Sequence, residues 1–313
     1  MNHTRSWWRT PTLMLGALAL VLAACGSDDS DDVGSGDAAG TGDGQAIVLA
    51  PQDFAESITL TEAYGQHLEA NGYDVTIQRP SGFREIVYPA LAAGDADIVI
   101  DYTGSAATFL DETGTPSPDE DETYERLTAA LDAEGLEAGA YSPAEDANAL
   151  VVLTTFAEEN DLTTISDLSS VEDQVTFGGS AQCIEREDCL LGYQSDEFYG
   201  LSFADVRTLE YGPPLAAGLL SGDIQAAQYQ TTAPEIASGD LVVLEDDLGL
   251  LSADNIVPIV RGEIVDEDLI ALLDELSEAL TTEDLIEWNE ATDIENEEPA
   301  EVATAWLEDN GLL

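Results

Sequence analysis

The sequence has no lysine and very little positive charge. All eight basic residues are arginines, against 65 aspartates and glutamates, which gives a formal net charge of −57 over 313 residues. Nucleic acids and anionic lipid surfaces are bound through clusters of basic side chains, so this composition excludes both as partners of the protein surface. The acids are spread along the chain, and two interpretations stay open. They form either a binding surface for a cationic partner or a carboxylate-rich surface adapted to high salt, where a Debye length of roughly 3 Å at about 1 M screens their repulsion.

The residues and motifs of most catalytic sites are also scarce. The chain has two histidines, and only His67 lies beyond the N-terminal segment described below. No GxSxG nucleophile motif, no metal-ligand cluster and no glycine-rich phosphate loop is present. We therefore expect no enzyme, no cofactor and no bound metal. His67 is interpreted as a packed or surface residue of a helix.

The first 24 residues have the pattern of a secretory signal peptide. Arg5 and Arg9 precede an apolar run, Leu13 to Ala24, that is too short to span a bilayer. The run ends in Leu-Ala-Ala-Cys, which resembles a bacterial lipobox and implies cleavage before Cys25 and attachment of lipid to its sulfur. A plain signal peptide that contains a cysteine by chance is the alternative. Without this segment the net charge becomes 6 − 65 = −59.

Residues 25–45 are predicted to be a disordered tether. After Cys25 the sequence reads GSDDSDDVGSGDAAGTGDGQ, in which almost nothing is apolar, so it cannot bury enough surface to fold. As a flexible coil it would span roughly 25 Å. We expect a monomer at the outer face of the cell membrane, in contact with that membrane only through the lipid anchor.

Two further cysteines, Cys183 and Cys189, lie in the segment QCIEREDCL. An even pair in an oxidising compartment is typical of a disulfide. So short a loop gains only roughly 2 kcal/mol from chain entropy. A redox or metal-binding role is the alternative, although no other cysteine of the mature body and only one histidine could take part.

From Ala46 the chain alternates strand and helix patterns, which favours parallel α/β units. Short apolar runs predict strands at 46–50, 74–78, 96–101, 149–154, 174–178, 224–230, 241–246 and 256–261. Helical spacing predicts helices at 54–71, 83–93 and 124–134, and a helical tail with an apolar stripe from Leu269 to Leu280. A loop rich in proline and acid occupies 113–121. One α/β set thus precedes about residue 145, and a second lies between about 150 and 245.

These segments, in this order, resemble the glycine betaine/choline (osmoprotectant) substrate-binding proteins of ABC transporters, in their lipoprotein form. The resemblance runs from about Ala46 to Leu313 and rests on an ordered set of stretches rather than on one motif. These stretches are APQDFAESITLTEAYGQHLEANGYDV, GFREIVYPALAAGDADIVIDYTGSA, TISDLSS, VTFGG, QCIEREDCLLGYQSDEFYGLSF, LLSGDIQAAQYQTT, LVVLEDDLGL, NIVPIVR and LTTEDLIEWNEATDIENEEPAEVATAWLEDNGLL.

The resemblance implies an α/β fold of the two-lobed periplasmic-binding-protein type II class (a Venus flytrap) with two inter-lobe crossings. Lobe 1 would comprise residues 46–145 and 256–313, and lobe 2 residues 146–255. Ligand would bind between the lobes, which would close by hinge motion. The implied function is that of a solute-binding lipoprotein that delivers a quaternary ammonium osmolyte to ABC permease and ATPase subunits. A sensory lipoprotein with the same fold is the alternative.

The resemblance also implies ligand-binding residues, because the family holds a quaternary ammonium ion among tyrosine faces. Tyr102 and Tyr229 match two of these aromatics, although a tyrosine packed on a capping turn is an alternative for Tyr102. Gln52 matches a polar contact after the first strand. Asp101 is either a counter-ion or a turn cap. The other expected contacts are Thr103 and Thr231, which follow the two tyrosines in their motifs.

Two positions depart from the family pattern. Asn148 and Asp254 stand where the family commonly has tyrosines. Asp254 could compensate by charge attraction in a closed cleft, and Tyr211 could supply a replacement ring. A changed ligand with more hydrogen-bond donors is the alternative. Arg186 could clamp a ligand carboxylate or form an ion pair with a neighbouring acid.

Overall fold

The computed structural model describes residues 42–79, 82–111 and 116–313. The predicted signal peptide, Cys25 and most of the predicted tether lie outside these residues. The last residues of that tether, 42–45, form a turn in which the Gly42 N–H donates to the Asn71 carbonyl at 3.0 Å. No helix in the described ranges is long and apolar enough to cross a membrane.

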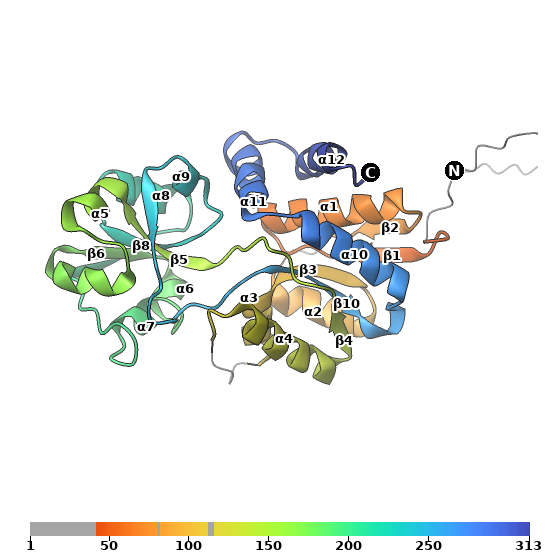
Figure 1. The fold of residues 1–313 in the computed structure, drawn as a ribbon, viewed down its shortest axis with the longest axis horizontal. Helices are drawn as coiled ribbons and strands as arrows, with labels where there is room; N and C mark the ends of the chain where they lie inside the picture. Colours follow the sequence, from red (N-terminus) through yellow and green to blue (C-terminus); the bar gives the residue numbers. More distant parts are fainter. Residues whose placement is uncertain (1–41, 80–81, 112–115) are drawn as a thin grey trace, which may run out of the picture. The chain divides into compact units, whose positions relative to one another are not determined.

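Two five-stranded mixed sheets organise the described chain, as the two-lobed α/β prediction requires (Figure 1). The first sheet has the order β2-β1-β3-β10-β4. Its strands are β1 (Ala46–Leu49), β2 (Asp74–Ile77), β3 (Ile98–Tyr102), β4 (Leu136–Ala138) and β10 (Ile256–Arg261). The second sheet has the order β7-β6-β8-β5-β9. Its strands are β5 (Asn148–Leu153), β6 (Thr176–Gly179), β7 (Asp205–Thr208), β8 (Ala226–Gln230) and β9 (Leu241–Leu244).

The prediction of parallel units holds for part of each sheet only. β1 pairs in parallel with β2 and β3, and β6 pairs in parallel with β7 and β8. In contrast, β10 is antiparallel to β3 and β4, and β5 is antiparallel to β8 and β9. β5 and β10 are the strands through which the chain enters each sheet from the other one. The direction of these two strands is set by the crossing from the other sheet. A parallel order comes from a strand–helix–strand unit within one sheet, and no such unit leads into either strand.

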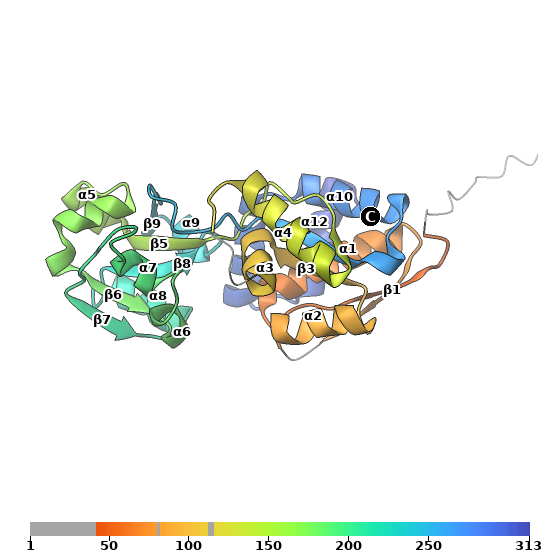
Figure 2. The same cartoon turned by 90° about the horizontal axis from the view of Figure 1, so that it is seen from below.

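Helices cover both faces of the first sheet. On one face Ile47 and Ile98 pack with the tail helices, and on the other Val99 packs with Val87 and Leu91 of α2. Figures 1 and 2 show α2, α3 and α4 together on this second side. The helices of the first sheet are α1 (Ala55–Ala70), α2 (Arg84–Ala93), α3 (Thr103–Leu110), α4 (Glu120–Glu134), α10 (Glu267–Ala279), α11 (Thr282–Asn289) and α12 (Pro299–Asn310).

The helices of the second sheet are shorter. They are α5 (Thr154–Asn160), α6 (Ala181–Ile184), α7 (Leu190–Gln194), α8 (Pro213–Leu220) and α9 (Pro234–Ala237). Short helical turns complete the described chain at η1 (Ile165–Ser170), η2 (Glu172–Gln174), η3 (Gly262–Ile264) and η4 (Glu290–Ile294). One of the two apolar cores of this half is built around Leu150, Phe177 and Tyr193, which are fully buried.

Helix α4 begins four residues before the predicted position. The side chain of Asp119 accepts a hydrogen bond from the Glu122 N–H at 2.9 Å, and the first turn carries three acids. Carboxylates stabilise a helix N-terminus through its free N–H groups and its dipole. The helix ends at Gly135, whose φ of 73° is a left-handed conformation that glycine adopts without strain.

Two crossing segments, residues 139–147 and 245–255, connect the sheets and lie against each other. Glu145 and Asn255 form an antiparallel bridge, and the Asp146 N–H donates to the Asp254 carbonyl at 3.1 Å. The Asn255 side chain donates to the Ser142 carbonyl, also at 3.1 Å. These hydrogen-bonded segments form the connection between the two sheets.

Candidate ligand-binding site

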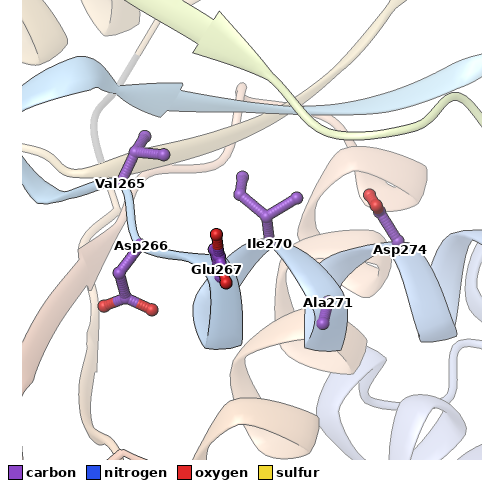
Figure 3. A pocket seen from close by; sticks show the side chains of 6 residues that line it. All are labelled: Val265, Asp266, Glu267, Ile270, Ala271 and Asp274. Carbon is purple, nitrogen blue, oxygen red and sulfur yellow. The ribbon is translucent and has the colours of Figure 1, made fainter.

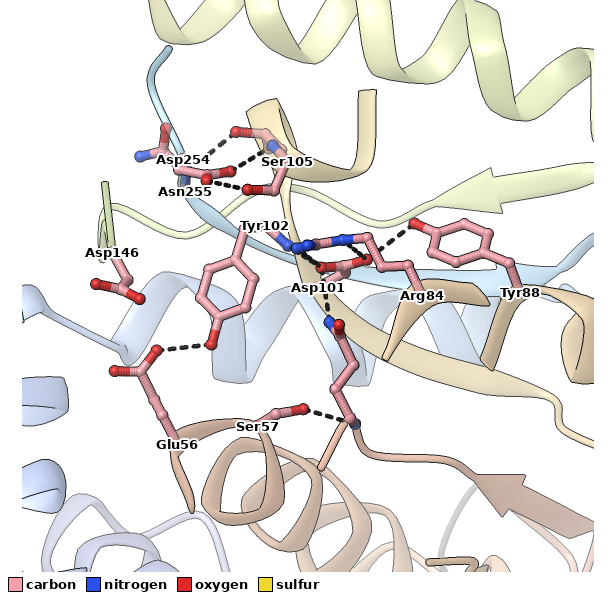
Figure 4. Close-up of polar contacts among 12 residues, drawn as sticks. Glu56, Ser57, Arg84, Tyr88, Asp101, Tyr102, Ser105, Asp146, Asp254 and Asn255 are labelled. Atoms are coloured by element: carbon pink, nitrogen blue, oxygen red, sulfur yellow. Dashed lines mark hydrogen bonds and ion pairs between the residues drawn. The ribbon is translucent and has the colours of Figure 1, made fainter. Parts of the chain in front are cut away.

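The structure has a cavity of about 760 Å³ at the carboxyl ends of strands from both sheets. Its wall includes residues that follow β1 and β3 of the first sheet and residues at the end of β8 of the second. The crossing segments contribute Asp146 and Asp254. Ligands of open α/β sheets bind at such strand ends. Figure 4 shows the polar groups on the side of the first sheet.

Most of the predicted ligand-binding residues line this cavity. These are Gln52, Tyr102, Asn148, Arg186, Tyr211, Tyr229 and Asp254. Asp101, Thr103 and Thr231 do not line it. The Thr103 hydroxyl accepts from the Asn255 N–H at 3.1 Å, and the Thr231 hydroxyl accepts from the Ala147 N–H at 3.0 Å. Both threonines therefore tie a sheet to a crossing segment.

Tyr102 ends β3, with its side chain buried on the cavity wall. Its hydroxyl donates to Glu56 at 2.7 Å, and its ring stacks on Phe54 with 6.2 Å between centroids. The Arg84 guanidinium lies 6.0 Å from the ring centroid. That distance is within the range of a cation–π contact, so the ring already interacts with a positive charge.

Tyr229 and Tyr211 form an aromatic pair on the opposite wall. Their ring centroids are 5.3 Å apart, and Tyr229 is 2% exposed whereas Tyr211 is 49% exposed. The Tyr211 hydroxyl donates to Gln230 Oε1 at 2.6 Å, and the Tyr229 hydroxyl donates to the Gly212 carbonyl at 3.4 Å. The pair presents one buried ring and one accessible ring to the cavity.

Asp101 lies behind this wall as the counter-ion of Arg84. Arg84 donates to it twice, through Nε at 3.1 Å and Nη2 at 2.6 Å. Tyr88 Oη donates to Asp101 at 3.0 Å (Figure 4). Gln52 Nε2 also donates to it, at 3.1 Å. Asp101 is fully buried, and these donors occupy both of its oxygens. Its charge is therefore neutralised within the protein.

Asp254 caps a helix and lines the cavity at the same time. Its carboxylate accepts from the Ser105 N–H at 2.8 Å and from the Ser105 hydroxyl at 2.6 Å, in the first turn of α3. Burial raises the pKa of Asp254 to about 7, although the hydrogen bonds from Ser105 and the charge of Arg84 act in the opposite direction. The group therefore becomes ionised as the pH rises through neutrality.

Glu56 and Asp146 are two further buried carboxyl groups on the wall, each 5% exposed. Glu56 accepts from Tyr102 and from Asn289 Nδ2 at 2.5 Å, and Asp146 accepts from the Thr232 hydroxyl at 2.7 Å. Burial raises the pKa of Glu56, and burial together with the charge of Glu56 raises that of Asp146. Figure 4 shows the two carboxyl groups directed toward one another.

Arg186 enters the wall from a loop closed by a disulfide. The structure joins Cys183 and Cys189, six residues apart. Arg186 Nε donates to Asp188 at 2.8 Å, and Nη2 also contacts that carboxylate. The arginine is therefore paired with a neighbouring acid, which is one of the two roles its sequence position allows.

A second hollow lies along α10, away from these residues (Figure 3). It is lined by Val265, Asp266, Glu267, Ile270, Ala271 and Asp274. All of its wall comes from one helix and the residues before it. It holds no aromatic ring and no positive charge, so it offers less to a ligand than the cavity between the sheets.

Sequence reasoning missed several groups of the cavity. Glu56, Asp146, Arg84, Ser105 and Asn289 all line it. Arg84 could have been singled out from the sequence, because it is one of only six arginines beyond the predicted signal peptide. The two acids could not, because only burial distinguishes them from the other 63.

The chain is similar in sequence to known proteins. A family described as "Substrate binding domain of ABC-type glycine betaine transport system" matches residues 45–309. The chain is 28% identical over 287 residues to a glycine-betaine-binding protein of Pseudomonas aeruginosa, covering 88% of this chain and 91% of that protein. It is also 28% identical over 259 residues to the glycine betaine-binding protein YehZ of Escherichia coli, covering 79% and 84% of the two chains.

Among solved structures, the fold is similar to that of a glycine betaine/carnitine/choline ABC transporter protein. The TM-score is 0.77 at 21% sequence identity, and the alignment covers 85% of this chain and 99% of that one. This likeness confirms the predicted type II periplasmic-binding-protein fold.

Proposed function

Because the chain belongs to the family of substrate-binding domains of ABC-type glycine betaine transport systems, we propose that it binds a quaternary ammonium osmolyte and delivers it to an ABC permease. Members of this family are extracytoplasmic solute-binding proteins, and the family is not one of enzymes. They bind a small ligand and work with the permease and ATPase components of a transporter. The osmolytes in question are glycine betaine, choline and proline betaine.

The observation that carries the proposal is the meeting of tyrosine rings and buried carboxylates in one cavity. A quaternary ammonium ion has no N–H and cannot be held by hydrogen bonds to its charge. Aromatic faces and nearby negative charges must hold it, and each good face contributes about 0.5–2 kcal/mol once water is excluded. Tyr102, Tyr211 and Tyr229 supply the rings, and Glu56, Asp146 and Asp254 the carboxylates.

The proposed ligand contacts follow from these positions. Tyr102 and Tyr229 face the cation from opposite walls, and Tyr211 adds a third ring in place of the tyrosines that Asn148 and Asp254 replace. Gln52 and Asn148 contact polar atoms of the ligand. Arg186, which pairs with Asp188, lines the cavity. Asp101 acts through Arg84, and Thr103 and Thr231 act by holding the crossing segments, without touching the ligand.

We further propose that the two lobes comprise residues 46–145 with 256–313, and residues 146–255, and that they close over the ligand. The crossing segments at 139–147 and 245–255 are the hinge, because the hydrogen-bonded pair they form connects the two sheets. In a ligand complex we expect the backbone dihedral angles to change in these segments and each sheet to keep its register.

Membrane attachment through Cys25 is part of the same proposal. The segment Leu-Ala-Ala-Cys after the apolar run supports cleavage before Cys25 and lipidation of its sulfur. We expect the expressed protein to incorporate labelled palmitate and to sediment with membranes, and Cys25→Ser to abolish both. Labelling that persists in Cys25→Ser would contradict the assignment.

Calorimetry of the mature protein in high salt tests the ligand class. The panel comprises choline, glycine betaine, proline betaine and carnitine, with glycine and proline as amines that carry N–H groups. We expect saturable binding of at least one quaternary amine at micromolar concentration and none of the two amino acids. Binding of the amino acids alone would favour a changed, more polar ligand, which Asn148 and Asp254 would hydrogen-bond. If the protein binds a quaternary amine but has no effect on the uptake of that amine by cells, a sensory role would be favoured.

A further inference from the structure

The cavity wall carries more buried carboxyl groups than its arginines pair with. Arg84 is engaged by Asp101, with contacts at 2.6 and 3.1 Å, and Arg186 is engaged by Asp188. Each of these pairs is close to neutral. Glu56, Asp146 and Asp254 have no ion pair with any arginine of the described residues, and each is 5% exposed. Burial raises the pKa of all three groups, and a cation that enters the cavity would favour their ionised forms.

Several hydrogen-bond donors of the wall are already used by these carboxylates. Tyr102 donates to Glu56, Ser105 to Asp254, and Thr232 to Asp146. Gln230 Nε2 also donates to Asp146, at 3.0 Å. A ligand carboxylate would have to compete with three protein carboxylates for these donors. A ligand without a carboxylate would leave these hydrogen bonds in place.

Unpaired acceptors on the wall point in the same direction. Gln52 is 1% exposed and Asn289 is 7% exposed, and both line the cavity. Gln52 Oε1 and Asn289 Oδ1 are buried without a hydrogen-bond partner among the described residues. A buried acceptor without a donor is costly. A ligand that brings a hydroxyl or another donor would relieve this cost, whereas a carboxylate would not.

We propose that the cavity selects cations without a carboxylate, of the choline class, over zwitterions such as glycine betaine. The inference rests on the proposed function, because both ligands carry the same trimethylammonium group and would use the same tyrosines. They differ at the other end. Choline has a hydroxyl that both donates and accepts, and it keeps a net charge of +1. Glycine betaine has a carboxylate that only accepts, and it would lie beside Glu56, Asp146 and Asp254.

Competitive calorimetry with choline and glycine betaine at pH 8.5 in high salt tests the proposal. At this pH Asp254 is ionised, since its pKa of about 7 lies below it. We expect choline to bind at least tenfold more tightly than glycine betaine. Asp146→Asn and Asp254→Asn should each weaken the binding of choline more than the binding of glycine betaine. The ratio of the two dissociation constants should then come closer to one. Thermal unfolding followed by circular dichroism verifies that the variants fold.

Glu308→Gln is the matched control, because it also removes one carboxylate but lies exposed on α12. It should leave the ratio unchanged. Equal or tighter binding of glycine betaine by the unmodified protein would overturn the charge selection while leaving the proposed function in place. Failure of both ligands to bind would overturn the charge selection, and failure of every quaternary amine of the panel would overturn the proposed function as well.

Discussion

Replacing Arg84 by methionine is expected to lower the free energy of unfolding by about 3–5 kcal/mol, the usual cost of leaving one partner of a buried ion pair uncompensated. Asp101 is fully buried and receives two hydrogen bonds from Arg84, whose own side chain is 23% exposed. The donors Tyr88 and Gln52 would remain, but neither carries a positive charge. Denaturant unfolding in high salt would measure the change.

Arg79→Met is the matched control for this substitution. Arg79 pairs with Glu62 at 3.5 Å, but its side chain is 66% exposed, so we expect a loss within about 0.5 kcal/mol. Combining Arg84→Met with Asp101→Asn should recover part of the stability, because the buried charge is then gone. A loss in Arg84→Met no larger than in Arg79→Met would show that Asp101 finds another partner, and the ion pair would not support the cavity wall.

Replacing Tyr229 by alanine is expected to weaken binding of the preferred quaternary amine at least tenfold, about 1.4 kcal/mol. Tyr229 is 2% exposed, so the substitution removes a ring from the wall and leaves space that water can enter. It also removes the ring on which Tyr211 packs at 5.3 Å between centroids. Calorimetry at fixed salt gives the change in affinity.

Two controls separate the ring from other effects. Tyr229→Phe keeps the ring and loses only the hydroxyl, which makes a long hydrogen bond to the Gly212 carbonyl at 3.4 Å, so affinity should stay within about threefold. Tyr73→Ala removes a buried tyrosine that packs in the core of the first sheet, outside the cavity and both crossing segments, and should leave affinity unchanged. If Tyr229→Ala bound the ligand as well as the unmodified protein does, this ring would have no part in the site.

Much of the fold could be predicted from local patterns, and the exceptions have physical causes. Apolar runs such as Leu150–Val152 and Val257–Val260 indicated buried strands because both faces of each sheet are covered. Their antiparallel direction could not be predicted, because it depends on where the chain crosses. Helix α3 was not predicted, since the group that caps its first turn, Asp254, lies 149 residues from Ser105 in sequence.

The site was predictable where residue type and position after a strand agree. Tyr102 and Tyr229 both stand at strand ends and both line the cavity. Asp101, which precedes Tyr102, stands in the same motif but lies behind the wall, because alternate residues of a strand face opposite sides. Glu56 and Asp146 could not be singled out, because only their burial distinguishes them. Burial cannot be assigned from sequence to two among 65 acids.

A crystal structure of the mature protein with choline tests most directly whether ring faces and carboxylates of this cavity hold an organic cation. We expect the ligand nitrogen within about 6 Å of the ring centroids of Tyr102 and Tyr229, with Asp146 or Asp254 on its open side. We also expect the second sheet to approach the first by rotation about residues 139–147 and 245–255. A cavity that stays empty at saturating choline, or a ligand bound away from both rings, would contradict the account.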